Sequence, residues 1–113
     1  MFKCFWGIPM AWLFLLIAGL CEIAWAIGLK FTEGFARLLP TIGTVVAMAA
    51  SIGFLGIALK SLPVGTAYAV WTGIGTVGTA ALGIYLFDEP LTLFRLACIG
   101  FILLGMIGLK ITT

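Results

Sequence analysis

The stretch MAWLFLLIAGLCEIAWAIGL, residues 10–29, decides the fold class because its 20 residues include one charged side chain, Glu22. A helix of this length rises about 30 Å, which matches the hydrocarbon core of a bilayer. Similar apolar runs follow at residues 40–59, 64–87 and 91–111. Only 9% of the chain is charged and 64% is hydrophobic, whereas globular proteins average roughly 25% charged residues. The sequence therefore predicts an integral membrane protein with four spans.

The four prolines, at positions 9, 40, 63 and 90, each lie at the head of one apolar run. Proline is tolerated in the first turn of a helix because the N–H that it lacks has no partner there. The runs do not alternate over ~10-residue units as the strands of a membrane barrel would. We expect an all-α fold with four transmembrane helices, a short extension at residues 1–9 and one domain at residues 10–113.

Several functional classes are excluded or disfavoured by the residue types present. The chain has no histidine and three cysteines, Cys4, Cys21 and Cys98, so neither a metal site nor a cofactor site is expected. The sequence shows no nucleophile–base pair that would point to an enzyme. The segment 73–78 fits the dinucleotide pattern G-x-G-x-x-G, but it lies inside an apolar span, where the required strand is missing. A cleaved signal peptide ending near residues 24–26 is a weaker alternative, because the apolar run continues beyond that point.

Positive charges are balanced between the two sides of the predicted membrane domain. With four spans, three cations fall on each side: Lys3, Lys60 and Lys110 on one, and Lys30, Arg37 and Arg95 on the other. Without the extension at residues 1–9, the count is two against three, still a weak bias. The positive-inside rule then dictates no orientation. Because four helices are also too few to enclose a polar path, we expect a dual-topology chain that pairs as an antiparallel homodimer. The alternative is one orientation set by other features.

Glu22 has no partner within its own helix. The residues one turn away are Ala18, Gly19, Trp25 and Ala26, none of them a cation. A charge at this depth costs about 2.5–3.5 kcal/mol on insertion scales, and such residues usually have a function. With Gly19 leaving space and Trp25 offering a π-face, the pattern is typical of a cation site. The alternative is a structural acid that is protonated or paired between helices.

Other spans carry small and aromatic residues on single helical faces. One helical face of the third span carries aromatic, hydroxyl and small residues, namely Tyr68, Trp71, Thr72, Gly75 and Thr79. Tyr68 and Trp71 also fit an interfacial belt. The second span carries a close-packing ridge that ends in a hydroxyl, at Gly43, Ala47 and Ser51. The fourth has a smooth surface that suits a dimer seam, at Gly100, Gly105 and Gly108. One membrane-embedded acid in a small dimer suggests exchange of a cation for protons.

Three stretches resemble the small multidrug resistance family, and specifically its guanidinium-exporter subtype. They are AGLCEIAWAIGLKFTEGFARLLP (18–40), KSLPVGTAYAVWTGIGTVGTAALG (60–83) and GMIGLKITT (105–113). The resemblance implies an antiparallel homodimer in the inner (cytoplasmic) membrane that exports guanidinium in exchange for protons. The expected partners are guanidinium, protons and the lipid bilayer, with no nucleic acid.

The resemblance also implies roles for individual residues. Glu22 would bind both the proton and guanidinium, with Ser51 and Trp71 donating hydrogen bonds to it. Trp25 and Tyr68 would line the same site, and Gly73 and Gly75 would form a bend. The alternative is the sister subtype, a polyspecific exporter of lipophilic or quaternary ammonium cations, against which Ser51, Lys110 and the WTGIG stretch argue. A non-transporting membrane subunit is a second alternative.

Overall fold

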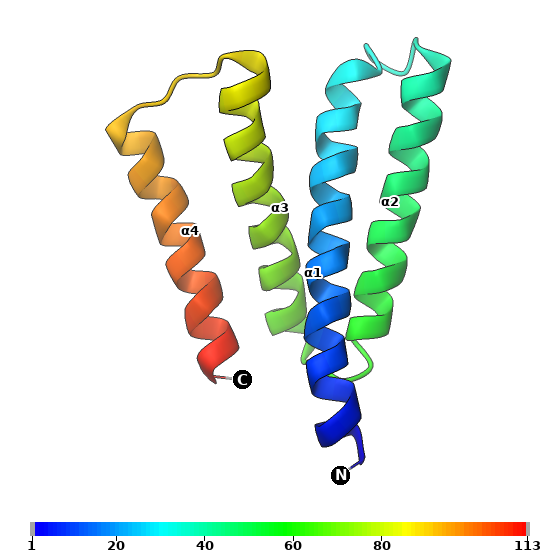
Figure 1. Cartoon of the computed structure of the whole chain (residues 1–113), viewed down its shortest axis with the longest axis vertical. Coiled ribbons are helices and arrows are strands. Elements are labelled where there is room, and N and C mark those ends of the chain that lie inside the picture. Colours follow the sequence, from blue (N-terminus) through cyan, green and yellow to red (C-terminus); the bar gives the residue numbers. More distant parts are fainter. Residues whose placement is uncertain (1, 113) are drawn as a thin grey trace.

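The chain folds into four α-helices arranged in one thin layer (Figure 1). The computed structural model describes the backbone of residues 2–112 and the side chains of residues 10–112. The helices are α1 (Phe2–Phe31), α2 (Leu38–Ala58), α3 (Val64–Phe87) and α4 (Leu93–Thr112). Across the layer their order is α4, α3, α1, α2, and the Cα atoms span 48 × 36 × 17 Å. The predicted all-α class with four helices is confirmed.

Each helix contains a segment long and apolar enough to cross a membrane. These segments are Met10–Phe31, Leu38–Ala58, Val64–Phe87 and Leu93–Thr112. They agree with the four predicted spans to within two residues at each end. Because the described chain alternates direction at every linker, both termini lie at one end of the layer, at the bottom of Figure 1. Lys60 and Lys110 lie at that end, and Lys30, Arg37 and Arg95 lie at the other.

The prolines mark helix starts in two of the four cases. Pro40 is the third residue of α2, and Pro63 immediately precedes α3. The prediction is wrong for Pro9, which lies within α1 because that helix already begins at Phe2. It is also wrong for Pro90, which lies in the α3–α4 linker. There the hydroxyl of Thr92 accepts the Arg95 N–H at 3.1 Å, so a threonine cap fixes the start of α4.

The backbone of residues 2–9 continues α1, and their side chains lie outside the described residues. The division of the chain into an extension at residues 1–9 and one domain at 10–113 stays a prediction.

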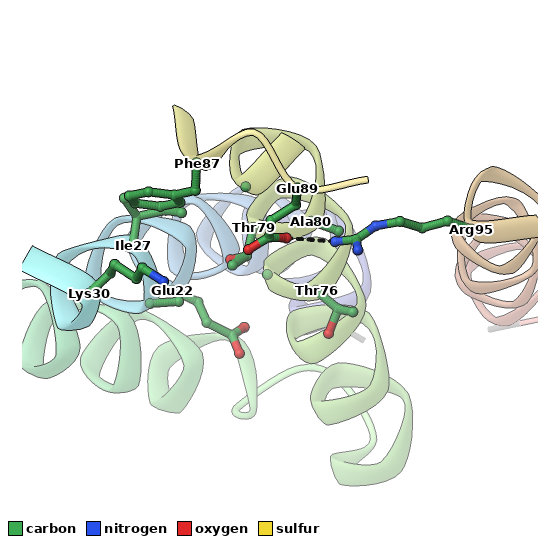
Figure 2. Close-up of a pocket in the computed structure, with 12 residues that line it drawn as sticks. Glu22, Ile27, Lys30, Thr76, Thr79, Ala80, Phe87, Glu89 and Arg95 are labelled. Atoms are coloured by element: carbon green, nitrogen blue, oxygen red, sulfur yellow. Dashed lines mark hydrogen bonds and ion pairs between the residues drawn. The ribbon is translucent and has the colours of Figure 1, made fainter. Parts of the chain in front are cut away.

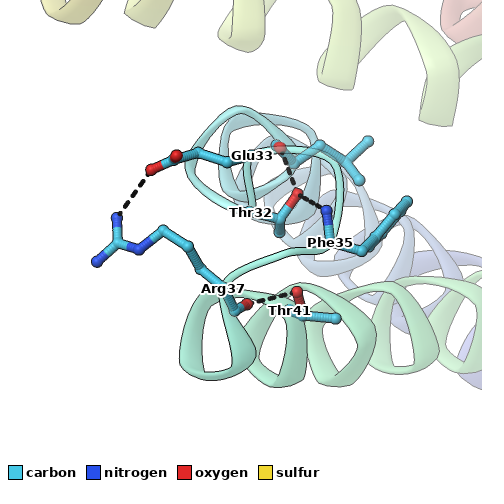
Figure 3. Close-up of polar contacts among 6 residues, drawn as sticks. Thr32, Glu33, Phe35, Arg37 and Thr41 are labelled. Atoms are coloured by element: carbon cyan, nitrogen blue, oxygen red, sulfur yellow. Dashed lines mark hydrogen bonds and ion pairs between the residues drawn. The ribbon is translucent and has the colours of Figure 1, made fainter.

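The α1–α2 linker is a tight turn held by one buried threonine (Figure 3). The Thr32 hydroxyl donates to the Leu29 carbonyl at 2.7 Å and accepts the Phe35 N–H at 3.2 Å. The turn passes through positive φ at Gly34, where glycine meets no steric penalty. On its outer side, an exposed ion pair joins Arg37 to Glu33 at 3.7 Å.

The core lies where α1 packs between α2 and α3. Its buried apolar side chains are small or medium in size: Ala11, Leu15, Ala18, Leu55, Ala58, Leu62, Ala67 and Val70. Glycines let the helices approach closely, since a Cβ at Gly78 would overlap Ile23 and one at Gly19 would overlap Ile74. Helix α4 packs against α3 and contains no buried residue. Helix α4 is therefore peripheral in the single chain.

We predict that Gly78→Ala destabilises the protein, because the added methyl group would push α1 away from α3 at Ile23. Overpacking of this kind costs about 1–3 kcal/mol. The midpoint of thermal unfolding in detergent should therefore fall. The matched control is Gly56→Ala in α2, where an added Cβ meets nothing within 4 Å. Equal midpoints for the two variants would contradict the close α1–α3 contact.

Candidate functional site

Glu22 lies near the middle of the first span and directs its carboxylate at the bare backbone of α3. A Cβ added at Gly75 would overlap that carboxylate, so only glycine leaves room for the acid there. Its Oε1 atom is buried and has no hydrogen-bond partner among the described residues. From Glu22 to Lys30, near the end of α1, the helix rises roughly 12 Å. The acid is therefore held at membrane depth with unused hydrogen-bonding capacity.

A cleft of about 480 Å³ opens beside Glu22, between α1, α3 and the α3–α4 linker (Figure 2). Its deeper wall includes Ala26, Gly75 and Thr79, and the Thr79 hydroxyl oxygen is also buried without a hydrogen-bond partner. The cleft is thus lined by small side chains, and two buried oxygen atoms without hydrogen-bond partners among the described residues lie at its wall.

Charged side chains surround the cleft near the linker end of α3. Arg95 reaches from α4 and donates from Nη2 to Oε1 of Glu89 at 2.7 Å (Figure 2). Lys30 places its ammonium 5.2 Å from the centre of the Phe87 ring, a cation–π contact. The cleft therefore has a charged outer part and a single acid, Glu22, in its inner part.

A second polar cluster joins α1, α2 and α3 one helical turn from Glu22. The Ser51 hydroxyl is fully buried and donates to the Ala18 carbonyl at 2.7 Å, and it accepts the Trp71 indole N–H at 2.9 Å. In an α-helix the Ala18 carbonyl also accepts the backbone N–H of Glu22. Ser51 and Trp71 are thus linked to Glu22 through the α1 backbone.

The predicted hydrogen bonds from Ser51 and Trp71 to Glu22 are absent in this conformation. The physical reason is that the two side chains satisfy each other and the Ala18 carbonyl, which lies one turn from Glu22. Tyr68 packs against Trp71 with ring centres 5.5 Å apart and is 56% exposed. The single chain does not join this aromatic pair to the cleft beside Glu22.

The remaining predicted residues have the following surroundings. Gly19 is buried against Ile74, and the Trp25 indole nitrogen is buried without a hydrogen-bond partner in the described part of the chain.

Helix α3 continues as one α-helix through Gly73, where the glycine leaves room for Met106 of α4. A bend at Gly73 and Gly75 stays a prediction. Glycines 100, 105 and 108 of α4 face open space, so the dimer seam also stays a prediction.

Sequence reasoning missed the contribution of Glu89, Arg95 and Thr79 to the cleft. Glu89 and Arg95 are six residues apart across a linker, and no helical spacing rule pairs them. The sequence places Thr79 only on a polar face of the third span. The one available signal was the repeat of Gly75, Thr79 and Gly83, which places three small residues along one face of α3. Across residues 10–112, no three His, Cys, Asp or Glu side chains are grouped as metal ligands.

Four apolar spans and a membrane-embedded acid beside a cleft define a small multi-pass membrane protein. The family described as "Small Multidrug Resistance protein" matches residues 10–102. The chain belongs to this family.

Relatives named "Guanidinium exporter" cover most of the chain. One from Yersinia pseudotuberculosis is 62% identical over 104 residues, which are 92% of this chain and 100% of the relative. One from Escherichia coli K12 is 58% identical over 92% of this chain and 99% of the relative. One from Proteus vulgaris is 54% identical over 92% of this chain and all of the relative. The family and these names indicate an exporter rather than an enzyme, in the inner membrane.

We predict that Ser51→Ala destabilises the protein, because the Trp71 N–H loses its acceptor in a buried site. An unsatisfied buried donor costs about 1–3 kcal/mol. Thermal unfolding in detergent measures the effect, and Ser61→Ala in the α2–α3 linker is the control. If Ser51→Ala unfolded at the same temperature as the control variant, the cluster would not hold the three helices together.

Proposed function

We propose that this protein exports guanidinium across the inner membrane in exchange for protons, with Glu22 as the shared binding group. The observation that carries the proposal is the unpaired carboxylate of Glu22 at membrane depth, seated on Gly75 beside a cleft. The relatives named as guanidinium exporters support the choice of substrate.

The chemistry of a carboxylate suits both ligands. Guanidinium is a planar cation with N–H donors in its plane, and a carboxylate can accept two of them side by side. A proton on the same carboxylate removes its charge and one acceptor position. The two ligands therefore compete, and a proton gradient in one direction can drive guanidinium in the other.

The residues around Glu22 would give this site its shape. Ser51, which accepts the Trp71 N–H, holds the α1 backbone at Ala18, one turn before Glu22, and so helps to position the acid. Trp25 contributes an indole near the acid, and aromatic faces attract cations. Tyr68, exposed on α3 in the single chain, would close over the substrate once a second chain completes the site.

An antiparallel homodimer with dual topology is part of the same proposal. Helix α4 has no buried residue and keeps large apolar side chains exposed, including Phe94, Phe101 and Leu104. A contact at Gly100, Gly105 and Gly108 would let two α4 helices approach closely. The equal number of cations on the two sides of the membrane supports insertion in both orientations.

We predict that guanidinium added outside proteoliposomes with an acidic interior drives protons out, so that an internal pH dye reports alkalinisation. Glu22→Gln should abolish this signal, because an amide keeps the size of the side chain but cannot exchange a proton or a charge. Glu33→Gln, which removes a loop carboxylate, should leave the signal intact. Exchange that persists in Glu22→Gln would refute the mechanism.

The same assay separates guanidinium from the alternative substrates, lipophilic or quaternary ammonium cations. A quaternary ammonium ion has no N–H donors for the carboxylate, so tetraethylammonium should give a much smaller signal than guanidinium. A larger signal with tetraethylammonium would instead favour a polyspecific exporter of lipophilic cations.

We predict that a single cysteine placed at the C-terminus of a variant lacking Cys4, Cys21 and Cys98 reacts with a membrane-impermeant maleimide from both faces of the membrane. The reason is that the balanced cations give neither orientation an advantage. About half of the chains should be labelled in sealed spheroplasts, and the rest only after permeabilisation. Labelling from one face alone would rule out dual topology.

A further inference from the structure

Two carboxylates, that of Glu22 from α1 and that of Glu89 from the α3–α4 linker, lie against one face of α3 at glycines about two turns apart. A Cβ at Gly75 would overlap the carboxylate of Glu22, and a Cβ at Gly83 would come within 2.6 Å of Glu89 Oε1. Thr79 lies midway between these glycines, and its buried hydroxyl oxygen has no hydrogen-bond partner among the described residues. Because the three α3 positions are spaced by four residues, they lie on one side of the helix over roughly 12 Å. All of these groups line the same cleft.

The outer carboxylate already binds a guanidinium group, that of Arg95. The Arg95 Nη2 to Glu89 Oε1 distance is 2.7 Å, typical of a charge-assisted hydrogen bond. The Glu89 side chain is 40% exposed and that of Arg95 is 33% exposed, and ion pairs with this exposure are weakly held. Free guanidinium has the same planar fork of N–H donors as the arginine side chain. The chain therefore contains a carboxylate that fits the substrate, occupied by a tethered group of the same chemistry.

The two partners differ in how firmly they are positioned. Glu89 fits against bare helix backbone at Gly83, and its own N–H donates to the Gly83 carbonyl at 3.4 Å. Arg95 reaches Glu89 on a long side chain from the peripheral helix α4 (Figure 2). If the pair separates, the carboxylate can therefore stay at the cleft while the arginine moves away.

We infer that Glu89 is an entry site for guanidinium, at which the ion displaces the Arg95 side chain before passing Thr79 and reaching Glu22. This inference rests on the proposed function. The site adds a second carboxylate to the path of the ion. Guanidinium can therefore exchange water for the Glu89 carboxylate first, and the Glu89 carboxylate for that of Glu22 afterwards. Arg95 neutralises Glu89 when no substrate is bound, and it favours onward movement of the ion by returning to the carboxylate.

The test is the concentration dependence of guanidinium–proton exchange in proteoliposomes. Glu89→Gln should raise the half-saturating guanidinium concentration about tenfold, because a hydrogen-bonded charge partner of the ion is lost. Gly83→Ala should also raise it, because the added Cβ displaces the Glu89 carboxylate without changing any charge. Arg95→Gln should lower the half-saturating concentration, because the competing guanidinium group is removed.

The matched control is Glu33→Gln, which removes a carboxylate from the α1–α2 linker at the same end of the molecule. Glu33 is also paired with an arginine, Arg37, but it does not line the cleft. The half-saturating concentration should stay unchanged in this variant, which separates binding at Glu89 from a general effect of surface charge.

Opposite shifts for Glu89→Gln and Arg95→Gln support the entry site, since a purely structural ion pair would make both variants change in the same direction. Shifts in the same direction would overturn the entry site. So would equal half-saturating guanidinium concentrations for Glu89→Gln and Glu33→Gln. These contradicting results overturn the entry site alone, provided that the native protein exchanges guanidinium and the Glu22→Gln variant does not. Absence of exchange in the native protein would overturn both the entry site and the proposed function.

Discussion

The structure depends on keeping one carboxylate, that of Glu22, at membrane depth. A charge there is costly, and its lone pairs have no water to bind in hydrocarbon. The fold meets this constraint with space on the facing helix, because Gly75 lets the acid lie against bare α3 backbone. Close contacts at Gly19 and Gly78 then hold α1 and α3 together on either side of the acid. The position of Glu22 thus depends on glycines that bind nothing themselves.

Positioning and binding are carried out by different groups in this arrangement. Ser51 and Trp71 satisfy each other's hydrogen bonds and fix the Ala18 carbonyl, so three helices meet at one buried hydroxyl. Glu22, one turn further along α1, keeps an Oε1 atom without a hydrogen-bond partner among the described residues. If Ser51 and Trp71 also donated to Glu22 in another conformation, they would first have to exchange partners. A change of partners of this kind would couple occupation of the acid to the packing of α1 against α2 and α3.

Much of the fold could be predicted because hydrocarbon imposes strong rules on sequence. Spans of about 20 apolar residues and a low charge content follow from the cost of burying polar groups in lipid, and Glu22 is recognisable as the exception to that rule. Helix starts were less predictable. Pro9 and Pro90 do not begin helices, since a threonine cap at Thr92 sets the start of α4 and α1 begins upstream of Pro9. The start of α4 thus depends on a single hydrogen bond rather than on hydrophobicity.

By itself, the sequence determined the number of spans, the isolated acid and the balanced cations, because these depend on residue type and position along the chain. Only the tertiary structure decided which groups meet: Glu22 with Gly75, Ser51 with Ala18 and Trp71, and Glu89 with Arg95. Helical periodicity gives the face on which a residue lies, but not the rotation and depth at which two helices pack. Those are set by side-chain volume at the contact, where a glycine opposite an acid leaves the space that a larger residue would fill.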